Sequence, residues 1–351
     1  MHPSATKLTT LSTPCRLHLG MFALGGQGRS YGGLGVMIAQ PRVEVTISAS
    51  ERLICSGSHA DRALEIVRRW HANQTCFTGK HSSTSCAEAF ESEISESVES
   101  LKCRVDVKAP DLHIGLGVGT QLALAIGAAL YAYFELPMPN VSELALSLGR
   151  GRRSAVGSFG FPLGGLIVDG GSDPDSHFPD LSGRFSIPAD WRFVLVQPKV
   201  EHELFGTCEN IAFDRLPAVA DATRDKLVSI AQDQLIPALI EIDFDRFAAS
   251  VGQFNRISGG LFAAVQGGPY HGQVLEQIVG ELAQAGFVGT GQSSWGPTLF
   301  VPAENEQRAE QAARLARNLI QSLGGEVAIT QADNDGFRLN SAFDKSSSAD
   351  T

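Results

Sequence analysis

The chain has 351 residues, a length typical of about two domains, and its composition of 43% apolar and 19% charged residues excludes a disordered chain. With 38 acidic and 28 basic residues its net charge is −10, which excludes nucleic acid as the main partner because a phosphate backbone requires a basic surface. The basic residues are 21 Arg and only 7 Lys, and Arg binds phosphate and carboxylate in a bidentate manner. An acidic chain of this kind can still hold a local anion site.

Cysteine spacing and hydropathy exclude zinc-finger, disulfide-scaffold and transmembrane proteins. None of the 6 Cys forms a CxxC pair or a zinc-binding spacing, and the amino-terminal residues contain no apolar signal segment. The longest apolar run, Leu122–Phe134, is too short to span a bilayer. We therefore expect a cytoplasmic protein with reduced thiols and no membrane association.

Hydrophobic periodicity predicts alternating strands and helices in the first half of the chain. In chain order these are a strand at Val43–Ala49, a helix at Asp61–Asn73, an amphipathic helix at Ser85–Cys103, a strand at Cys103–Val107, a buried helix at Gln121–Phe134, a short helix at Val141–Gly149 and a strand at Gly164–Asp169. The Gly-, Pro-, Ser- and Asp-rich segment Ser172–Ile187 is predicted to be a linker.

The second half begins with a predicted strand and contains several helices. The predicted elements are a strand at Arg192–Pro198, helices at Asp221–Ile242, Phe244–Phe254 and Gln273–Gln284, strands at Phe287–Gly291 and Thr298–Pro302, a helix at Asn305–Leu323 and a strand at Glu326–Thr330. This β-α-β-β-α-β order predicts a ferredoxin-like unit. We expect the tail, residues 344–351, to be disordered.

A glycine-rich loop leads into the buried helix and is the strongest local signal. Gly115, Gly117 and Gly119 alternate along it and are followed by Thr120 and Gln121. Exposed backbone N–H groups at a helix N-terminus favour phosphate or pyrophosphate. The loop lacks the lysine and the spacing of a Walker A motif. The alternative is a helix entry whose glycines only allow close packing.

Two further motifs contain arginine. Arg150, Arg152 and Arg153 lie beside glycines and suit an anion with several charges, whereas the alternative is a solvated surface loop. Arg16 and His18 are two residues apart, so on a strand they share one face. The alternative there is a strand with a partly exposed polar face.

A late Gly-rich segment and one buried acid complete the candidates. The segment Gly289–Pro297 has polar groups and one Trp that suit a pocket wall, although a plain turn between strands is the alternative. Asp169 follows an apolar strand and is either a strand-end ligand or a turn cap. The sequence predicts no Ser-His-Asp triad, since Ser293 lacks the GxSxG context.

The order of these motifs resembles the GHMP superfamily. The motifs are PxRxHxG (14–20), GLGVGTQ (115–121), GRGRRSAVGSFGFPLGGLIVDGG (149–171) and GQSSWGPT (291–298), and they are similar to those of the β-ribofuranosylaminobenzene 5′-phosphate synthase branch. The resemblance extends from about residue 14 to about residue 336. It implies an α+β, GHMP-type two-domain fold. Residues 1–185 would resemble the second domain of ribosomal protein S5, and residues 186–343 would be ferredoxin-like.

The resemblance also implies an activity. The family transfers a pentosyl group: it joins 4-aminobenzoate to phosphoribosyl pyrophosphate, with loss of CO₂ and pyrophosphate, in tetrahydromethanopterin biosynthesis. Mg²⁺ and a homodimer are implied in the same way, and no pyridoxal phosphate or nicotinamide is expected. The sequence leaves open whether 4-aminobenzoate or 4-hydroxybenzoate is preferred.

Two departures from the superfamily pattern keep alternatives open. Val118 stands where the phosphate loop usually has Ser, and Gly157–Phe161 has no acid where GHMP kinases have an Asp that serves the acceptor hydroxyl. The first departure leaves a catalytically silent binding or regulatory protein as one alternative. The other alternative is a small-molecule kinase that uses ATP, against which the missing acid counts.

The resemblance leads us to expect these residue roles. The loop from Gly115 to Gln121 would take the diphosphate or the 5′-phosphate, and Arg16 and His18 would orient a carboxylate or a phosphate. The further candidates are Arg29, Arg150, Arg152 and Arg153 for the anion, Asp169 and Glu209 for Mg²⁺ or developing positive charge, and Ser293, Ser294 and Trp295 for the aromatic pocket. We also expect an Arg-to-Lys exchange at Arg153 to reduce activity more than one at Arg62, which is predicted to lie on the surface.

Overall fold

The computed structural model describes residues 6–24, 31–77, 98, 101–173, 175–200, 216 and 219–344. Arg29, Glu209 and nearly all of the helix predicted at Ser85–Cys103 lie outside this range. The remaining candidate residues all lie within it.

The first sheet is antiparallel except at one edge. Its order is β11-β1-β2-β4-β3, with β5 paired to β2 and β6 paired to β5. The strands are β1 (Thr6–Met21), β2 (Gly33–Ala49), β3 (Ile54–Gly57), β4 (Cys103–Lys108), β5 (Leu166–Asp169), β6 (Leu181–Phe185) and β11 (Arg338–Asp344). In β4 the apolar residues Cys103, Val105 and Val107 are buried while the charged residues between them face outward. One face of the sheet therefore forms a core.

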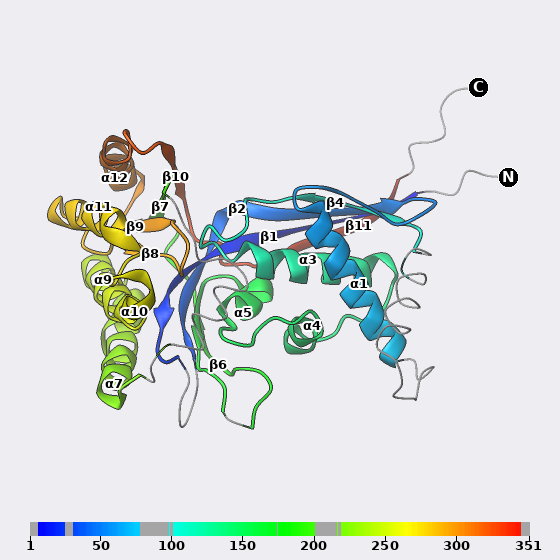
Figure 1. Cartoon of the computed structure of the whole chain (residues 1–351), viewed down its shortest axis with the longest axis horizontal. Helices are drawn as coiled ribbons and strands as arrows, with labels where there is room; N and C mark the ends of the chain where they lie inside the picture. The colour runs from blue at the N-terminus through cyan, green and yellow to red at the C-terminus, as the bar shows by residue number, and fades with distance from the viewer. Residues whose placement is uncertain are drawn as a thin grey trace.

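Helices cover that face of the first sheet (Figure 1). They are α1 (Ala60–Phe77), α3 (Val118–Tyr133), α4 (Val141–Ser147) and α5 (Val156–Leu163). Helix α3 is apolar on nearly all sides, and its residues from Gln121 to Leu130 are buried against β1 and β2. Helix α4 begins with a capping box between Asn140 and Glu143.

The second sheet has the order β10-β7-β9-β8 and all its neighbours are antiparallel. Its strands are β7 (Arg192–Pro198), β8 (Gly291–Gln292), β9 (Leu299–Ala303) and β10 (Gly325–Thr330), and α11 (Gly272–Gln284) and α12 (Glu306–Leu319) pack over them. Counted along the chain, the spatial order is fourth, first, third, second, which is the ferredoxin-like arrangement. The predicted fold class is confirmed.

A helical layer follows β7 and leads to the site (Figure 1). It consists of α7 (Asp221–Ser229), a π-helical turn η1 (Ile230–Leu235), α8 (Ile236–Ile240), α9 (Phe244–Gly260) and α10 (Ala263–Gln266). Helix α9 contacts both β1 of the first sheet and β8 of the second. Within the described residues, no helix is both long and apolar enough to cross a membrane.

Two predictions about the elements are wrong. The segment Ser172–Ile187 is not a plain linker, because it contains β6, an edge strand of the first sheet. The strand predicted at Phe287–Gly291 is a turn over most of its length, closed by the Thr290 N–H donating to the Phe287 carbonyl at 3.1 Å.

The last strand of the chain returns to the first sheet. Strand β11 pairs with β1 from Thr6↔Asp344 to Ser12↔Arg338. The first sheet therefore contains both ends of the described chain, and Asp344 is its last paired residue rather than the start of a tail. The division at residues 185 and 186 stays a prediction.

Candidate active site

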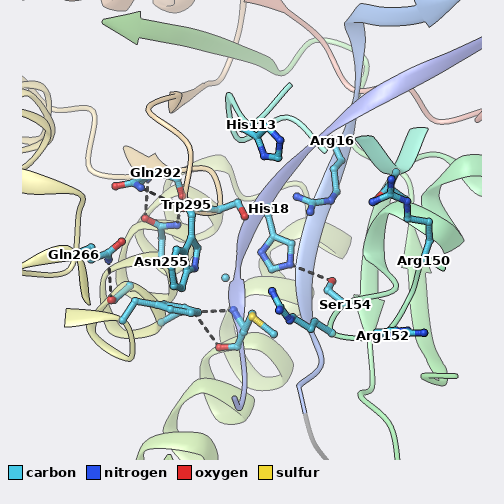
Figure 2. Close-up of a pocket in the computed structure, with 18 of the residues that line it drawn as sticks. Arg16, His18, His113, Arg150, Arg152, Ser154, Asn255, Gln266, Gln292 and Trp295 are labelled. Carbon is cyan, nitrogen blue, oxygen red and sulfur yellow. Dashed lines mark hydrogen bonds between the residues drawn. The ribbon is translucent and has the colours of Figure 1, made fainter. Parts of the chain in front are cut away.

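The sequence motifs meet in one cleft with two lobes. The larger lobe has a volume of about 670 Å³ and the smaller about 430 Å³. The lobes adjoin, since seven residues line both: Arg16, Arg62, His113, Thr120, Arg150, Ser294 and Trp295. In Figure 2 arginines occupy the right side of the cleft and amide side chains the left, with Trp295 and His18 between them.

The glycine-rich loop is held against β1 and the late turn. The Arg16 N–H donates to the Leu116 carbonyl at 3.0 Å. Gly117 has φ +67°, and a Cβ there would lie 2.6 Å from Cγ of Arg16. At Gly119 the nearest atoms to such a Cβ are 3.9 Å away, two of them in the Arg150 guanidinium. Close packing therefore accounts for Gly117, whereas Gly119 lines the smaller lobe and is open toward a cation.

Thr120 and Gln121 have different surroundings. Thr120 lines both lobes. Gln121 is fully buried, accepts a hydrogen bond from the Thr13 hydroxyl at 2.8 Å and donates to the Gly157 carbonyl at 2.8 Å. Its side chain joins α3 to β1 and α5, and it does not line either lobe. The phosphate contact predicted for it is not available to its side chain.

Arg150 carries a mostly buried cation that has no anionic partner within the described residues. Burial, together with the neighbouring Arg62 and Arg69, lowers the pKa of Arg150 to about 10. Its Nε is buried without a hydrogen bond. Neither Arg150 nor the exposed Arg152 forms an ion pair within the described part of the chain. Such a cation cluster is electrostatically strained until an anion binds.

Arg62 is exposed, as predicted, but it also belongs to the site. Arg62 stands in the first turn of α1, lines both lobes and forms an ion pair with Glu65. Its side chain is 44% exposed, so one side of it still faces solvent. Arg153 lines the larger lobe, as predicted for a site residue. No motif surrounds Arg62, and only the packing of α1 beside Arg150 reveals its position.

A hydrogen-bonded chain runs from His18 to Asp169 through Ser154. The Nε2 of His18 lies 3.2 Å from the Ser154 hydroxyl, which also hydrogen-bonds to the Asp169 carboxylate. Because a serine has one proton and a carboxylate requires a donor, Ser154 donates to Asp169 and accepts from the Nε2–H of His18. This arrangement selects one tautomer of a neutral imidazole.

Burial determines the charge states at the two ends of this chain. It holds the pKa of His18 well below 6.5, and Arg16 lowers it further. Burial raises the pKa of Asp169, against the effect of its hydrogen-bond donors, among them the backbone N–H groups of Ala155 at 2.6 Å and Gly171 at 3.0 Å. Asp169 lines neither lobe. Of the two interpretations, the structure shows the cap: Asp169 anchors the loop and Ser154.

Trp295 forms an aromatic wall of the larger lobe. Its ring meets that of Phe262 edge to face at 5.0 Å between centroids, and Met21 lies in the same cluster. Ser294 lines both lobes, but Ser293 is fully buried beneath them. The Ser293 hydroxyl accepts from the His18 N–H at 2.9 Å and donates to the Gly115 carbonyl at 2.7 Å. Ser293 therefore joins the motifs instead of facing a ligand.

Amide side chains close the far end of the larger lobe, and the sequence analysis did not single them out. Asn255 of α9 donates to the Leu19 and Gln292 carbonyls at 2.7 and 2.9 Å. Gln292 lies within the predicted late segment, and Gln266 ends α10. No periodicity or spacing marks Asn255 or Gln266. The docking of α9 against β1 and β8 brings Asn255 to the cleft, and Gln266 follows at the end of α10.

The described residues do not form a site for Mg²⁺. Among those lining the two lobes, Glu65 alone carries a carboxylate, and it pairs with Arg62. The described range also contains no cluster of three or more His, Cys, Asp or Glu with the geometry of a metal site. We therefore derive no step through a metal held by the protein.

Comparisons with known proteins agree with this architecture. The family model "GHMP kinases C terminal" matches residues 235–320. The beta-ribofuranosylphenol 5'-phosphate synthase of Methanothermobacter thermautotrophicus is 28% identical over 342 residues, which covers 93% of this chain and 97% of that protein. The enzyme of the same name from Archaeoglobus fulgidus is 28% identical over 345 residues, or 94% and 98% of the two chains.

Among solved structures, the homoserine kinase of Cytophaga hutchinsonii has a TM-score of 0.64 at 15% identity, covering 95% of this chain and 97% of that one. This likeness concerns the fold alone. The chain therefore contains a segment similar to the C-terminal part of GHMP kinases, and it resembles the ribofuranosyl phosphate synthases over nearly its whole length.

Proposed function

We propose that the protein is a decarboxylating phosphoribosyltransferase that condenses 4-aminobenzoate, or a close para-substituted relative, with phosphoribosyl pyrophosphate. The products are a β-ribofuranosylbenzene 5′-phosphate, CO₂ and pyrophosphate. The observation that carries the proposal is the cleft itself, which sets a cationic glycine-lined lobe beside an aromatic-walled one. The names of the relatives support a ribofuranosyl phosphate synthase role.

The proposed reaction requires no net proton transfer. The C1–O bond of the ribose breaks and its electron pair leaves with pyrophosphate. The ring carbon that bears the carboxylate then forms a bond to ribose C1. Finally the bond from this ring carbon to the carboxylate breaks, its electron pair restores aromaticity, and CO₂ departs. The protein must therefore gather anions, hold the ring against ribose C1 and shield the cationic sugar.

The described residues suit these tasks. Arg150, Arg62 and the Gly119 backbone surround the smaller lobe and would hold the diphosphate or the 5′-phosphate. Arg16 lies at the junction of the two lobes, where the carboxylate of the aromatic acid must meet ribose C1. The neutral His18 beside it adds no further positive charge next to the developing oxocarbenium ion. Trp295 would lie against the ring of the aromatic acid.

The kinase alternative has less support. Kinase chemistry requires a group that accepts the proton of the acceptor hydroxyl, commonly an Asp. None of the described residues lining the larger lobe is an Asp or a Glu. The structural likeness to kinases is a likeness of fold at 15% identity or less.

One experiment separates these functions. The purified protein is incubated with Mg²⁺, phosphoribosyl pyrophosphate and carboxyl-labelled 4-aminobenzoate or 4-hydroxybenzoate, with Mg²⁺ present as a counter-ion of the diphosphate. We expect release of labelled CO₂ in equal amount to pyrophosphate. Absence of labelled CO₂ above the blank for both acids would exclude the synthase, and ATP turnover with a panel of small alcohols would then support a kinase.

A further inference from the structure

Gln266 presents a fixed hydrogen-bond acceptor at the amide end of the larger lobe. It is 8% exposed and lines the cleft opposite the arginines (Figure 2). Its Nε2 donates to the carbonyls of Gly259 at 3.0 Å and Gly268 at 3.1 Å. Carbonyl oxygens only accept hydrogen bonds, so the amide atom that faces both of them must be the NH₂ nitrogen. The orientation of the Gln266 amide is therefore fixed by its partners. The Oε1 must face the other way.

The side-chain oxygens of the neighbouring polar residues at this end already accept hydrogen bonds. Ser258 accepts from the Met21 N–H at 2.7 Å and donates to the Met21 carbonyl at 3.0 Å. Gln292 accepts from the His271 N–H at 2.8 Å and donates to the Ser294 carbonyl at 3.2 Å. Asn255 accepts from the Gln292 N–H at 3.0 Å and makes two donations.

Gln266 differs from these three side chains. Its Oε1 has no hydrogen-bond partner within the described residues. The Oε1 stays accessible from the cleft rather than sealed in the interior, so a ligand that displaces water here leaves it unpaired unless the ligand supplies a donor. The lobe therefore favours a ligand with an N–H or O–H group at this end.

The order of groups along the cleft gives the ligand a direction. Cations stand at one end, Trp295 in the middle and the Gln266 amide at the other end (Figure 2). In a para-substituted benzoate the carboxylate and the para group lie at opposite ends of a flat ring. If the carboxylate faces the arginines, the para group points toward the amide end.

We propose that Gln266 is a specificity-determining residue that accepts a hydrogen bond from the para substituent of the aromatic acid. The inference rests on the proposed function for the class of substrate. It predicts that the cleft selects para-amino and para-hydroxy benzoates over analogues of equal size without a donor. 4-Methylbenzoate is the matched analogue, because a methyl group has nearly the size of an amino group and donates nothing.

Calorimetric binding of 4-aminobenzoate, 4-hydroxybenzoate and 4-methylbenzoate to the whole chain tests the proposal without turnover. We expect wild type to bind 4-aminobenzoate and 4-hydroxybenzoate at least about fivefold more tightly than 4-methylbenzoate, which corresponds to the net value of one hydrogen bond. Gln266→Met keeps the length of the side chain but removes the acceptor. It should reduce that ratio to about one, because binding of 4-aminobenzoate and 4-hydroxybenzoate weakens while binding of 4-methylbenzoate does not change. Gln277→Met removes an exposed Gln that hydrogen-bonds to Glu281 of its own helix, and it should keep the wild-type ratio.

Two outcomes would overturn the inference. One is equal binding of all three acids by wild type, a result that does not depend on whether any variant folds. The other is a loss in Gln266→Met that affects 4-methylbenzoate as much as 4-aminobenzoate, which indicates a merely structural residue. Failure of the proposed function gives a different result: selective binding with no CO₂ release would leave the role of Gln266 standing and remove the synthase reaction.

Discussion

Gly296 and Gly115 lie backbone against backbone, and this contact joins the late turn to the glycine-rich loop. A Cβ at Gly296 would stand 2.1 Å from the amide nitrogen of Gly115 and 2.2 Å from the carbonyl carbon of Ile114. These atoms are backbone, so no flexible side chain can move aside. The wall of the aromatic lobe and the anion loop are therefore built as one unit.

Gly296→Ala should accordingly damage both lobes at once. We expect a loss of about 2–3 kcal/mol in the free energy of unfolding, measured with urea, because the added methyl group forces backbone apart. Gly280→Ala is the matched control: it lies in helix α11, and a Cβ there meets nothing within 4 Å. The control should gain about 0.5–1 kcal/mol from the lower backbone entropy of Ala. Equal stability of the Gly296 variant and wild type would show that the two loops can separate.

Arg150→Met should stabilise the ligand-free protein while weakening anion binding. The variant removes a mostly buried cation whose neighbours are also cations and whose Nε has no partner. We expect a Tm a few degrees above wild type without ligand, and a Kd for pyrophosphate raised at least about tenfold, because a charge-assisted hydrogen bond is lost. Arg246→Met, which breaks exposed ion pairs with Glu241 and Asp243, should leave the Kd unchanged. A lower Tm combined with unchanged pyrophosphate affinity would remove Arg150 from the anion site.

Arg62 cannot serve as the surface control for the Arg153→Lys exchange, because it lines the cleft. Arg62 lines both lobes, so Arg62→Lys should lower kcat/KM for phosphoribosyl pyrophosphate by about threefold to tenfold, as should Arg153→Lys. Lysine keeps the charge but loses the planar fork that binds a phosphate at two points. Arg246→Lys on the surface of α9 should match wild type. If Arg62→Lys had the same kcat/KM as wild type under initial-rate conditions, Arg62 would not bind the substrate despite its position at the cleft.

Local sequence patterns predicted the elements whose stability depends on their own periodicity. Helix α3 is apolar throughout and β4 alternates strictly, so both could be recognised without tertiary information. Strand β6, Leu181–Phe185, could not, since it contains Gly and Ser, and its one strand partner within the described residues is β5. Phe287 and Val288 are apolar in sequence, but Val288 is 51% exposed in a turn.

In the site, too, local motifs predicted some residues and tertiary packing decided the others. Motifs with glycine and arginine identified the loop and Arg150, because their chemistry is visible locally. They did not separate Gly119, which is open to the smaller lobe, from Gln121, whose amide is used inside the core. Arg62 and Gln266 come from helices with no functional motif, and only the packing of α1 against α3 and of α10 against the cluster of Met21 and Trp295 brings them to the cleft.

The buried neutral His18 should make folding stability depend on pH. Its pKa in the folded protein is held well below the unfolded value of 6.5 by burial and by Arg16. The unfolded chain therefore binds more protons than the folded one below pH 6.5. The stability that depends on neutral His18 is complete above that pH and is lost as the pH falls through 6.5. The loss can reach about 1.4 kcal/mol for each pH unit.

His18→Gln tests this dependence, since the Gln amide can still donate to Ser154 but does not titrate. We expect urea unfolding between pH 5 and 7.5 to show a steeper loss of stability in wild type than in the variant, with the two curves separating only below pH 6.5. Other groups that respond to pH, such as His71 with its lowered pKa and Asp169 with its raised pKa, remain in both proteins and cancel in the difference. Parallel curves would mean that His18 is protonated as easily in the folded protein as in the unfolded chain, and the tautomer assigned through Ser154 and Asp169 would then be wrong.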